Sequence, residues 1–313
     1  MSLYSLVRPI LFAVEPEKAH SLGLWFLEYG RRGKIPSRPV ETAFGRLENP
    51  IGAPAGYDKT GGHLSALENL GFGYIVAGTF TLNPYPGNPR PRVVRRVSEE
   101  AIVNSLGFPN PGVGAFLANL SKAKVGVPVL ASISGRTIPD VLECYSRVQP
   151  HVPGVEVNLS SPNTPDLRDL REPSAFSELA QGLAKLKKKP TYLKVPPHID
   201  EPQFSAVLSM VKLWESLGFE GATASNTIPM EEPRLAIGRG GYSGPMLFDH
   251  TLAAVKALRS VVSKGFEINA VGGIRSASDV RRCLELGATT VQIFTALVYS
   301  GPGLIKKVLS DLR

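Results

Sequence analysis

Short apolar runs alternate with helical patterns from about residue 44 to the C-terminus. The runs are rich in β-branched residues and short enough to be buried strands. Eight such strands are predicted, at residues 51–55, 74–78, 128–133, 155–159, 191–195, 221–225, 267–271 and 290–294. Helical segments such as 201–217 and 276–286 lie between most of them. This alternation predicts an α/β protein built on a (β/α)₈ TIM barrel. A doubly wound sheet is the alternative, although no G-x-G-x-x-G turn follows the first strand.

The N-terminal segment has a different pattern. Apolar residues recur at steps of three and four between residues 3 and 14, which predicts an amphipathic helix that Pro9 either kinks or begins. A second helix is expected to begin at Pro16, which suits a first helical turn, and to stop at Gly30. A basic stretch with several helix breakers follows.

We therefore predict two parts, an N-terminal helical pair with its linker over residues 1–43 and a barrel over residues 44–313. A short amphipathic pair next to a basic stretch suits a lid, a docking surface or an interfacial membrane anchor. The simpler alternative is a helical pair that packs on the barrel and has no membrane role.

Polar side chains follow the predicted strands at their C-terminal ends, the face on which barrel enzymes build their sites. The densest stretch is V-E-V-N-L-S-S-P-N-T-P, residues 155–165. Its two carboxamides and two hydroxyls, at Asn158, Ser161, Asn163 and Thr164, could hold a planar polar ring. An ordinary turn rich in Asn, Ser and Pro is the alternative interpretation.

Residues near the ends of three further strands indicate which kind of ligand could bind at the barrel mouth. Gly272, Gly273 and Thr295 follow the last two strands, where glycines and free backbone N–H groups commonly bind a phosphate. Lys194 is expected among apolar neighbours in the barrel mouth. A cation there could stabilise the reduced ring of a flavin. It could also serve as a Schiff-base amine in a non-redox, phosphate-binding barrel enzyme.

Composition limits the other classes of function. The chain has 43% hydrophobic residues, and its 35 Lys and Arg against 27 Asp and Glu give a net charge of +8. The basic excess is scattered and no base-reading motif accompanies it, so nucleic-acid binding is not expected. The two cysteines and five histidines lack metal-ligand spacing. No apolar run reaches the roughly 20 residues of a spanning helix, and no signal peptide is expected.

Six motifs occur in the order and spacing of one family. They are N-P-I-G-A-P-A-G-Y-D-K, G-T-F-T-x-x-P-Y-P-G-N-P-x-P-R, N-S-L-G-F-P-N-P-G, N-L-S-S-P-N-T-P-D-L-R, V-G-G-I and Q-I-F-T-A-L-V-Y-S-G-P. From about residue 7 onward the chain resembles FMN-dependent dihydroorotate dehydrogenase. Ser161 stands where the cytosolic branch has a cysteine, and L-V-R-P-I-L-F-x-x-x-P-E-K-A-H resembles the opening of the quinone-linked (class 2) branch.

The resemblance implies oxidation of dihydroorotate to orotate in pyrimidine biosynthesis. Ser161 would take a proton from C5 while C6 passes a hydride to FMN N5, and Thr164 and Phe108 would line the proton exit. The implied substrate ligands are Lys59, Asn104, Asn158, Asn163, Asn226 and Thr227. The implied FMN ligands are Ala55, Gly56, Lys59, Thr79, Ser132, Asn158, Lys194, Ser225, Gly244, Gly272, Gly273, Phe294 and Thr295. His20 and Arg95 match positions that face the quinone tunnel.

The same resemblance implies a peripheral membrane protein on the cytoplasmic side, with its N-terminal helices at the bilayer. Some positions depart from the quinone-linked pattern: Ser132-Ile133-Ser134-Gly135-Arg136 is closer to the cytosolic branch, Pro109 interrupts a G-F-N pattern, and Phe294 replaces a common tyrosine. Fumarate, NAD or a partner subunit therefore stay open as alternative electron acceptors. The sequence does not give the quinone or the oligomeric state.

Overall fold

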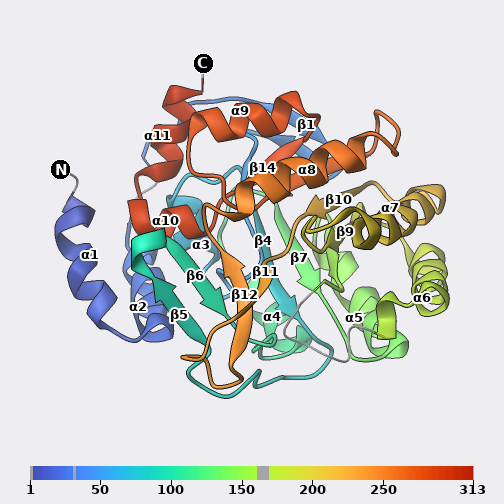
Figure 1. Cartoon of the computed structure of the whole chain (residues 1–313), viewed down its shortest axis with the longest axis horizontal. Helices are drawn as coiled ribbons and strands as arrows, with labels where there is room; N and C mark the ends of the chain where they lie inside the picture. The colour runs from blue at the N-terminus through green and yellow to red at the C-terminus, as the bar shows by residue number, and fades with distance from the viewer. Residues whose placement is uncertain (1–2, 31–32, 161–168, 313) are drawn as a thin grey trace.

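The computed structural model describes residues 3–30, 33–160 and 169–312, and a closed barrel of eight parallel strands forms its centre (Figure 1). In order around the barrel these are β3 (Ile51–Ala53), β4 (Tyr74–Phe80), β7 (Val129–Ile133), β8 (Val155–Asn158), β9 (Thr191–Val195), β10 (Gly221–Ala224), β13 (Glu267–Val271) and β14 (Thr290–Gln292). The eight predicted strands and the TIM barrel are confirmed. Because β14 pairs with β3, the sheet closes and the doubly wound alternative is wrong.

Helices cover the outside of the barrel. They are α3 (Leu64–Asn69), α4 (Val113–Leu120), α5 (Ile138–Val148), α6 (Pro173–Leu186), α7 (Glu201–Ser216), α8 (Leu247–Arg259), α9 (Ala277–Glu285), α10 (Thr295–Ser300) and α11 (Leu304–Asp311). Both helices predicted by residue range, α7 and α9, lie within one residue of the predicted ends. Each begins at a side-chain cap, since Asp200 accepts from the Gln203 N–H and Ser276 from the Asp279 N–H.

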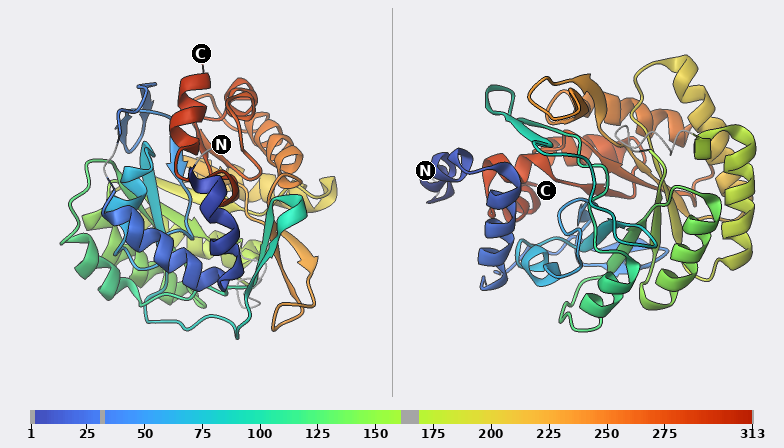
Figure 2. Two further views of the ribbon diagram at one scale, coloured as in Figure 1. Left: turned by 90° about the vertical axis from the view of Figure 1, so that its left-hand side faces the viewer. Right: turned by 90° about the horizontal axis from the view of Figure 1, so that it is seen from below.

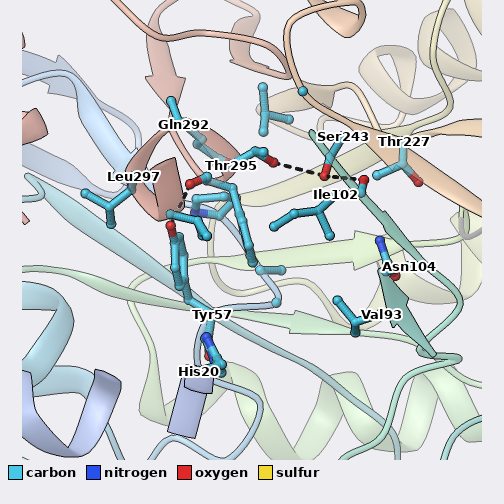
Figure 3. A pocket seen from close by; sticks show the side chains of 18 of the residues that line it. His20, Tyr57, Val93, Ile102, Asn104, Thr227, Ser243, Gln292, Thr295 and Leu297 are labelled. Carbon is cyan, nitrogen blue, oxygen red and sulfur yellow. Dashed lines mark hydrogen bonds between the residues drawn. The ribbon is translucent and has the colours of Figure 1, made fainter. Parts of the chain in front are cut away.

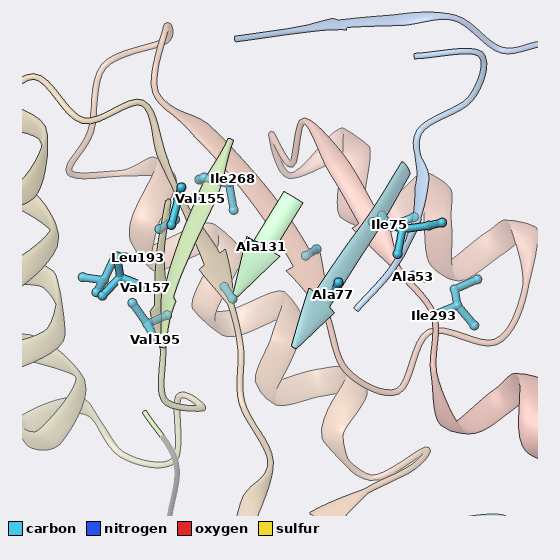
Figure 4. Close-up of a cluster of buried hydrophobic side chains, with 14 of the residues drawn as sticks. Ala53, Ile75, Ala77, Ala131, Val155, Val157, Leu193, Val195, Ile268 and Ile293 are labelled. Carbon is cyan, nitrogen blue, oxygen red and sulfur yellow. The ribbon is translucent and has the colours of Figure 1, made fainter. Parts of the chain in front are cut away.

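The apolar core lies between the strands and these helices (Figure 4). Val155 and Val157 of β8 belong to it and are fully buried. Successive side chains of a strand point to opposite faces, so the residues between and after them, Glu156 and Asn158, point into the barrel.

The interior of the barrel is polar toward the N-terminal ends of its strands. The Tyr74 hydroxyl lies 2.7 Å from the Thr290 hydroxyl, which donates in turn to Asn269 Oδ1. A hairpin of β1 (Val40–Thr42) and β2 (Gly45–Leu47) closes this end, and its Phe44 ring lies 5.3 Å from the Tyr74 ring. The hairpin does not cover the opposite end of the barrel, where the C-terminal ends of the strands lie.

A second sheet, which the hydrophobic pattern did not predict, lies over the barrel mouth. Its strands are antiparallel and follow the order β11 (Ile228–Glu231), β12 (Arg239–Ser243), β6 (Ala101–Asn104) and β5 (Val93–Arg96). A one-turn 3₁₀ helix, η1 (Val97–Glu99), joins β5 to β6. The sheet is formed by insertions after β4 and after β10, which the chain brings together above the barrel.

The two predicted N-terminal helices are present as α1 (Leu3–Ala13) and α2 (Pro16–Glu28). Pro9 lies inside α1 and does not begin it, whereas Pro16 begins α2 as predicted. The helices lie on one side of the barrel, α1 beside α10 and α2 beside α3 and β5 (Figure 2). In the part of the chain that the structure describes, no helix combines the length and apolarity needed to cross a bilayer.

Candidate active site

A cavity of about 380 Å³ opens at the C-terminal ends of the barrel strands. Its wall continues from the barrel mouth, past β5, β6 and β12, to α1 and α2, so one space joins the barrel to the N-terminal helices (Figure 3). Eighteen of the predicted site residues lie on this wall: His20, Ala55, Gly56, Lys59, Thr79, Arg95, Asn104, Phe108, Asn158, Lys194, Ser225, Asn226, Thr227, Gly244, Gly272, Gly273, Phe294 and Thr295.

A chain of hydrogen bonds orients the amides in the barrel mouth. Asn158 Nδ2 donates to Thr79 Oγ1 at 3.0 Å, and Asn158 Oδ1 accepts from the Ser160 hydroxyl at 3.2 Å. The same hydroxyl accepts from Asn226 Nδ2 at 3.0 Å. The ends of β4, β8 and β10 are thereby joined, and each amide is held in one orientation by a defined partner.

Lys59 reaches the same space from the loop after β3. Its Nζ donates to the Gly56 carbonyl at 2.5 Å. Burial lowers the pKa of Lys59 to about 8, although the negative charges of Glu17 and Asp58 act to raise it. Asp58 shapes this loop, since Oδ1 accepts from the Gly61 N–H at 2.8 Å. A lysine of this kind is a cation at neutral pH and suits an anionic ligand.

The opposite end of the cavity is built from backbone and hydroxyl groups. Gly272 and Gly273 have φ of +130° and +68°, and a Cβ on Gly273 would lie 2.5 Å from the Phe248 backbone nitrogen. Only glycine is compatible with that position. Thr295 donates to the Ser243 hydroxyl at 2.9 Å (Figure 3). Glycine turns, hydroxyls and the start of α10 form an uncharged cradle that fits a phosphate.

Lys194 of β9 also lies on the cavity wall, but its predicted apolar surroundings are wrong. Its Nζ lies 3.9 Å from Oε1 of Glu156, on the neighbouring strand β8. Both side chains are buried, with exposed fractions of 8% and 1%. The sequence did not reveal this partner, because only the pairing of β8 with β9 brings Glu156 close to Lys194.

His20 and Arg95 line the part of the cavity next to the N-terminal helices. His20 Nε2 lies 2.7 Å from the Tyr57 carbonyl and donates to it. Burial, together with the charge of Lys59, lowers the pKa of His20 to about 4, so the ring is neutral at neutral pH. Arg95 Nη1 donates to the Phe12 and Val14 carbonyls at 3.1 and 2.8 Å and so fastens the end of α1 to β5.

Comparison with known proteins identifies the family. The family model described as dihydroorotate dehydrogenase matches residues 40–313. The chain belongs to the dihydroorotate dehydrogenase family. Proteins named dihydroorotate dehydrogenase (quinone) are 35% identical in Flavobacterium lutescens, with 99% of this chain and 96% of the relative covered, and 36% identical in Cupriavidus pinatubonensis, with 100% and 99% covered. One from Neisseria meningitidis is 35% identical, with 99% of both chains covered.

Solved structures of dihydroorotate dehydrogenase share the fold. A complex with ferulenol from Eimeria tenella has a TM-score of 0.85 at 22% identity, with 97% of this chain and 93% of that chain covered. The ligand-free protein from the same organism has a TM-score of 0.84 at 24% identity, with 95% and 94% covered. The match to the family model confirms the predicted family membership. Because this family is flavin-dependent, the non-redox barrel enzyme is not supported.

Some residues predicted for the dihydroorotate dehydrogenase site lie off the wall. Ser132 is fully buried behind Thr79, whose hydroxyl lies 3.0 Å from its own. Ser161, Asn163 and Thr164 lie outside the described residues. The departure at residue 134 has a structural use, because the Ser134 hydroxyl donates to the Asn158 carbonyl at 2.8 Å.

Four residues of the site were missed by sequence reasoning. Ser160 links two amides, Glu156 faces Lys194, Ser243 pairs with Thr295, and Tyr57 stacks on Phe294 with ring centroids 4.0 Å apart. Ser160 and Tyr57 stand inside the quoted motifs and could have been found there. Ser243 lies in a sheet that the pattern did not predict.

Proposed function

We propose that this protein oxidises dihydroorotate to orotate on bound FMN and passes the electrons to a quinone that enters between α1 and α2. The observation that carries this proposal is a continuous cavity that joins the amides and lysines of the barrel mouth to the N-terminal helices. The family membership and the relatives named dihydroorotate dehydrogenase (quinone) support both the reaction and the acceptor.

The donor set of the cavity fits FMN. Its phosphate would bind the cradle of Gly272, Gly273, Thr295 and Ser243, and Lys194 would lie beside the pyrimidine end of its ring. Ala55, Gly56, Thr79 and Ser225 would line the remainder, with Gly244 and Phe294 toward the phosphate. Bound FMN would accept a hydride from the substrate and release two electrons to the quinone.

The substrate would bind where the amides converge. Asn158 and Asn226, fixed through Ser160, would hold the dihydropyrimidine ring together with Asn104, Asn163 and Thr227. Lys59 would bind the carboxylate as a cation. Ser161 directly follows Ser160 in sequence and would take the C5 proton, with Thr164 and Phe108 on the exit path.

The N-terminal helical pair would connect this site to the membrane. Among the described residues, eight large apolar side chains of α1, α2 and their flanks are exposed: Leu6, Val7, Ile10, Val14, Leu22, Trp25, Phe26 and Tyr29. An exposed apolar face of this kind suits peripheral binding to a bilayer, here on the cytoplasmic side. Residues 1–43 would form the quinone entry, lined by His20 and Arg95, and residues 44–313 the FMN barrel.

Steady-state turnover of dihydroorotate with a soluble quinone, fumarate and NAD⁺, compared in parallel, tests the proposed acceptor. We expect turnover with quinone at least about a hundredfold above that with the other two, a free-energy difference of about 2.7 kcal/mol between barriers. Equal or greater turnover with fumarate or NAD⁺ would reject the quinone assignment and leave dihydroorotate oxidation standing.

A further inference from the structure

Glu156 is a buried carboxylate that the proposed reaction does not use. Its exposed fraction is 1%, and neither carboxylate oxygen has a hydrogen-bond partner among the residues that the structure describes. A buried carboxylate without donors is costly, and acidic side chains are almost never fully buried unless paired. The ammonium of Lys194, 3.9 Å from Oε1, is therefore the charge that stabilises the buried Glu156 carboxylate.

The barrel register places Glu156 one layer below the cavity. Asn158 is opposite Lys194 and lines the cavity, while Glu156 is opposite Tyr192, two residues earlier on the same inward face of β8. Glu156 is absent from the cavity wall. It therefore touches neither a cofactor nor a substrate in the cavity and acts only through a neighbour.

Glu267, a second carboxylate in the barrel, has a structural role and serves as a comparison for Glu156. Glu267 begins β13 at the N-terminal end of the barrel. Its Oε2 accepts from the Tyr192 hydroxyl at 2.6 Å, and its Oε1 accepts from the Ala43 N–H at 2.6 Å. Glu267 is thus bonded on both oxygens, whereas Glu156 has an ionic partner and no hydrogen bond in the described part of the chain.

We propose that Glu156 is a positioning residue that holds Lys194 against the flavin ring, offsets part of its positive charge and thereby lowers the reduction potential of the flavin. This inference rests on the proposed function. Two-electron reduction places negative charge on the pyrimidine end of the ring, which the Lys194 ammonium stabilises. The carboxylate behind the ammonium weakens that stabilisation, so the reduced flavin gives its electrons to quinone more readily.

The two-electron midpoint potential of the bound flavin, measured by dye equilibration at pH 6, tests the proposal in a double-mutant cycle. Glu156→Gln is expected to favour the reduced flavin about tenfold, a rise of about 30 mV. Lys194→Met is expected to lower the potential. Adding Glu156→Gln to Lys194→Met should change little further, because Glu156 lies outside the cavity wall and acts on the flavin only through the Lys194 ammonium. The matched control, Glu267→Gln, should leave the potential unchanged.

An unchanged or lowered potential in Glu156→Gln, or an equal shift in both backgrounds, overturns the role of Glu156. Wild-type protein purified without flavin would instead defeat the proposed function itself, so the two failures are distinguishable. If Glu156→Gln loses its flavin, urea unfolding of the four proteins of the cycle (wild type, the two single variants and the double variant) decides. We expect Glu156→Gln to lower the unfolding midpoint only in the background that retains Lys194, and additive effects would overturn the proposal.

Discussion

At the scale of single residues, the site depends on side chains whose state is set by distant neighbours. His20 is neutral because it is buried beside Lys59, and Lys194 meets Glu156 only because β8 and β9 pair in the barrel. The motifs indicated which residue types gather at the barrel mouth. They did not indicate these pairings, because 38 residues separate Glu156 from Lys194 in the sequence.

His20 predicts a dependence of stability on acid. Its pKa in the folded protein, about 4, lies below its ordinary value of 6.5, so the unfolded chain binds the proton more readily. The contribution of the neutral ring to the free energy of unfolding is therefore complete above pH 6.5 and is lost as the pH falls toward 4. Urea unfolding at pH 7 and 5 should show a larger loss of stability for wild type than for His20→Gln. Equal losses would contradict burial of the neutral ring.

Ser161 predicts a separation of cofactor binding from chemistry. Ser161→Ala should retain FMN and slow flavin reduction by dihydroorotate by a factor of roughly 10² to 10⁴, the range for loss of a general base. Ser161→Cys should slow it less, because a thiol can still take the proton. Stopped-flow absorbance of the flavin measures both variants. A rate in Ser161→Ala equal to that of wild type would remove Ser161 from the reaction.

At the scale of helices and strands, the eight barrel strands were predictable because each is a short run buried on both faces. The sheet over the barrel mouth was not, because β5 and β11 are only partly buried and β12 reads R-G-G-Y-S. β3 ends two residues before its predicted end because Pro54 has no N–H to donate to the ladder. The N-terminal helices were predictable from their periodicity, but their attachment to the barrel was not.

The attachment of α2 predicts a stability effect at Glu17. Arg92, with 8% of its side chain exposed, donates from Nη2 to Glu17 Oε1 at 2.9 Å. Burial acts to raise the pKa of Glu17, but the hydrogen bond and charge of Arg92 outweigh it and lower the pKa. Glu17→Gln should destabilise the protein by about 2 kcal/mol, because it leaves the buried Arg92 side chain without its carboxylate partner.

A matched control distinguishes this pair from a surface pair. Glu41 lies 3.6 Å from Arg46, with 75% and 70% of the two side chains exposed. Glu41→Gln should therefore change the free energy of unfolding by less than about 0.5 kcal/mol. Urea unfolding measures both variants, and similar small effects would contradict a structural role for Glu17 in fastening α2.

At the scale of the whole molecule, eight of the eleven exposed large hydrophobic side chains of the described residues belong to the N-terminal pair and its flanks. Figure 2 shows this pair on one side of the barrel, and residues of both helices line the cavity. Phe26→Glu, which places a charge on a side chain that is 73% exposed, should weaken binding to anionic lipid vesicles at least about tenfold. Ile199→Glu, at an exposed position just before α7, is the control and should bind as wild type. Cosedimentation with vesicles measures both, and equal binding by the two variants would contradict membrane contact through α2.

The central claim is that a flavin bound in this cavity accepts electrons from dihydroorotate and passes them to a quinone. Anaerobic addition of dihydroorotate to the purified protein, followed by a soluble quinone, tests it in one cuvette. We predict a yellow protein whose flavin absorbance bleaches with dihydroorotate and returns with quinone. A colourless protein, or flavin absorbance that dihydroorotate leaves unchanged, would contradict the account.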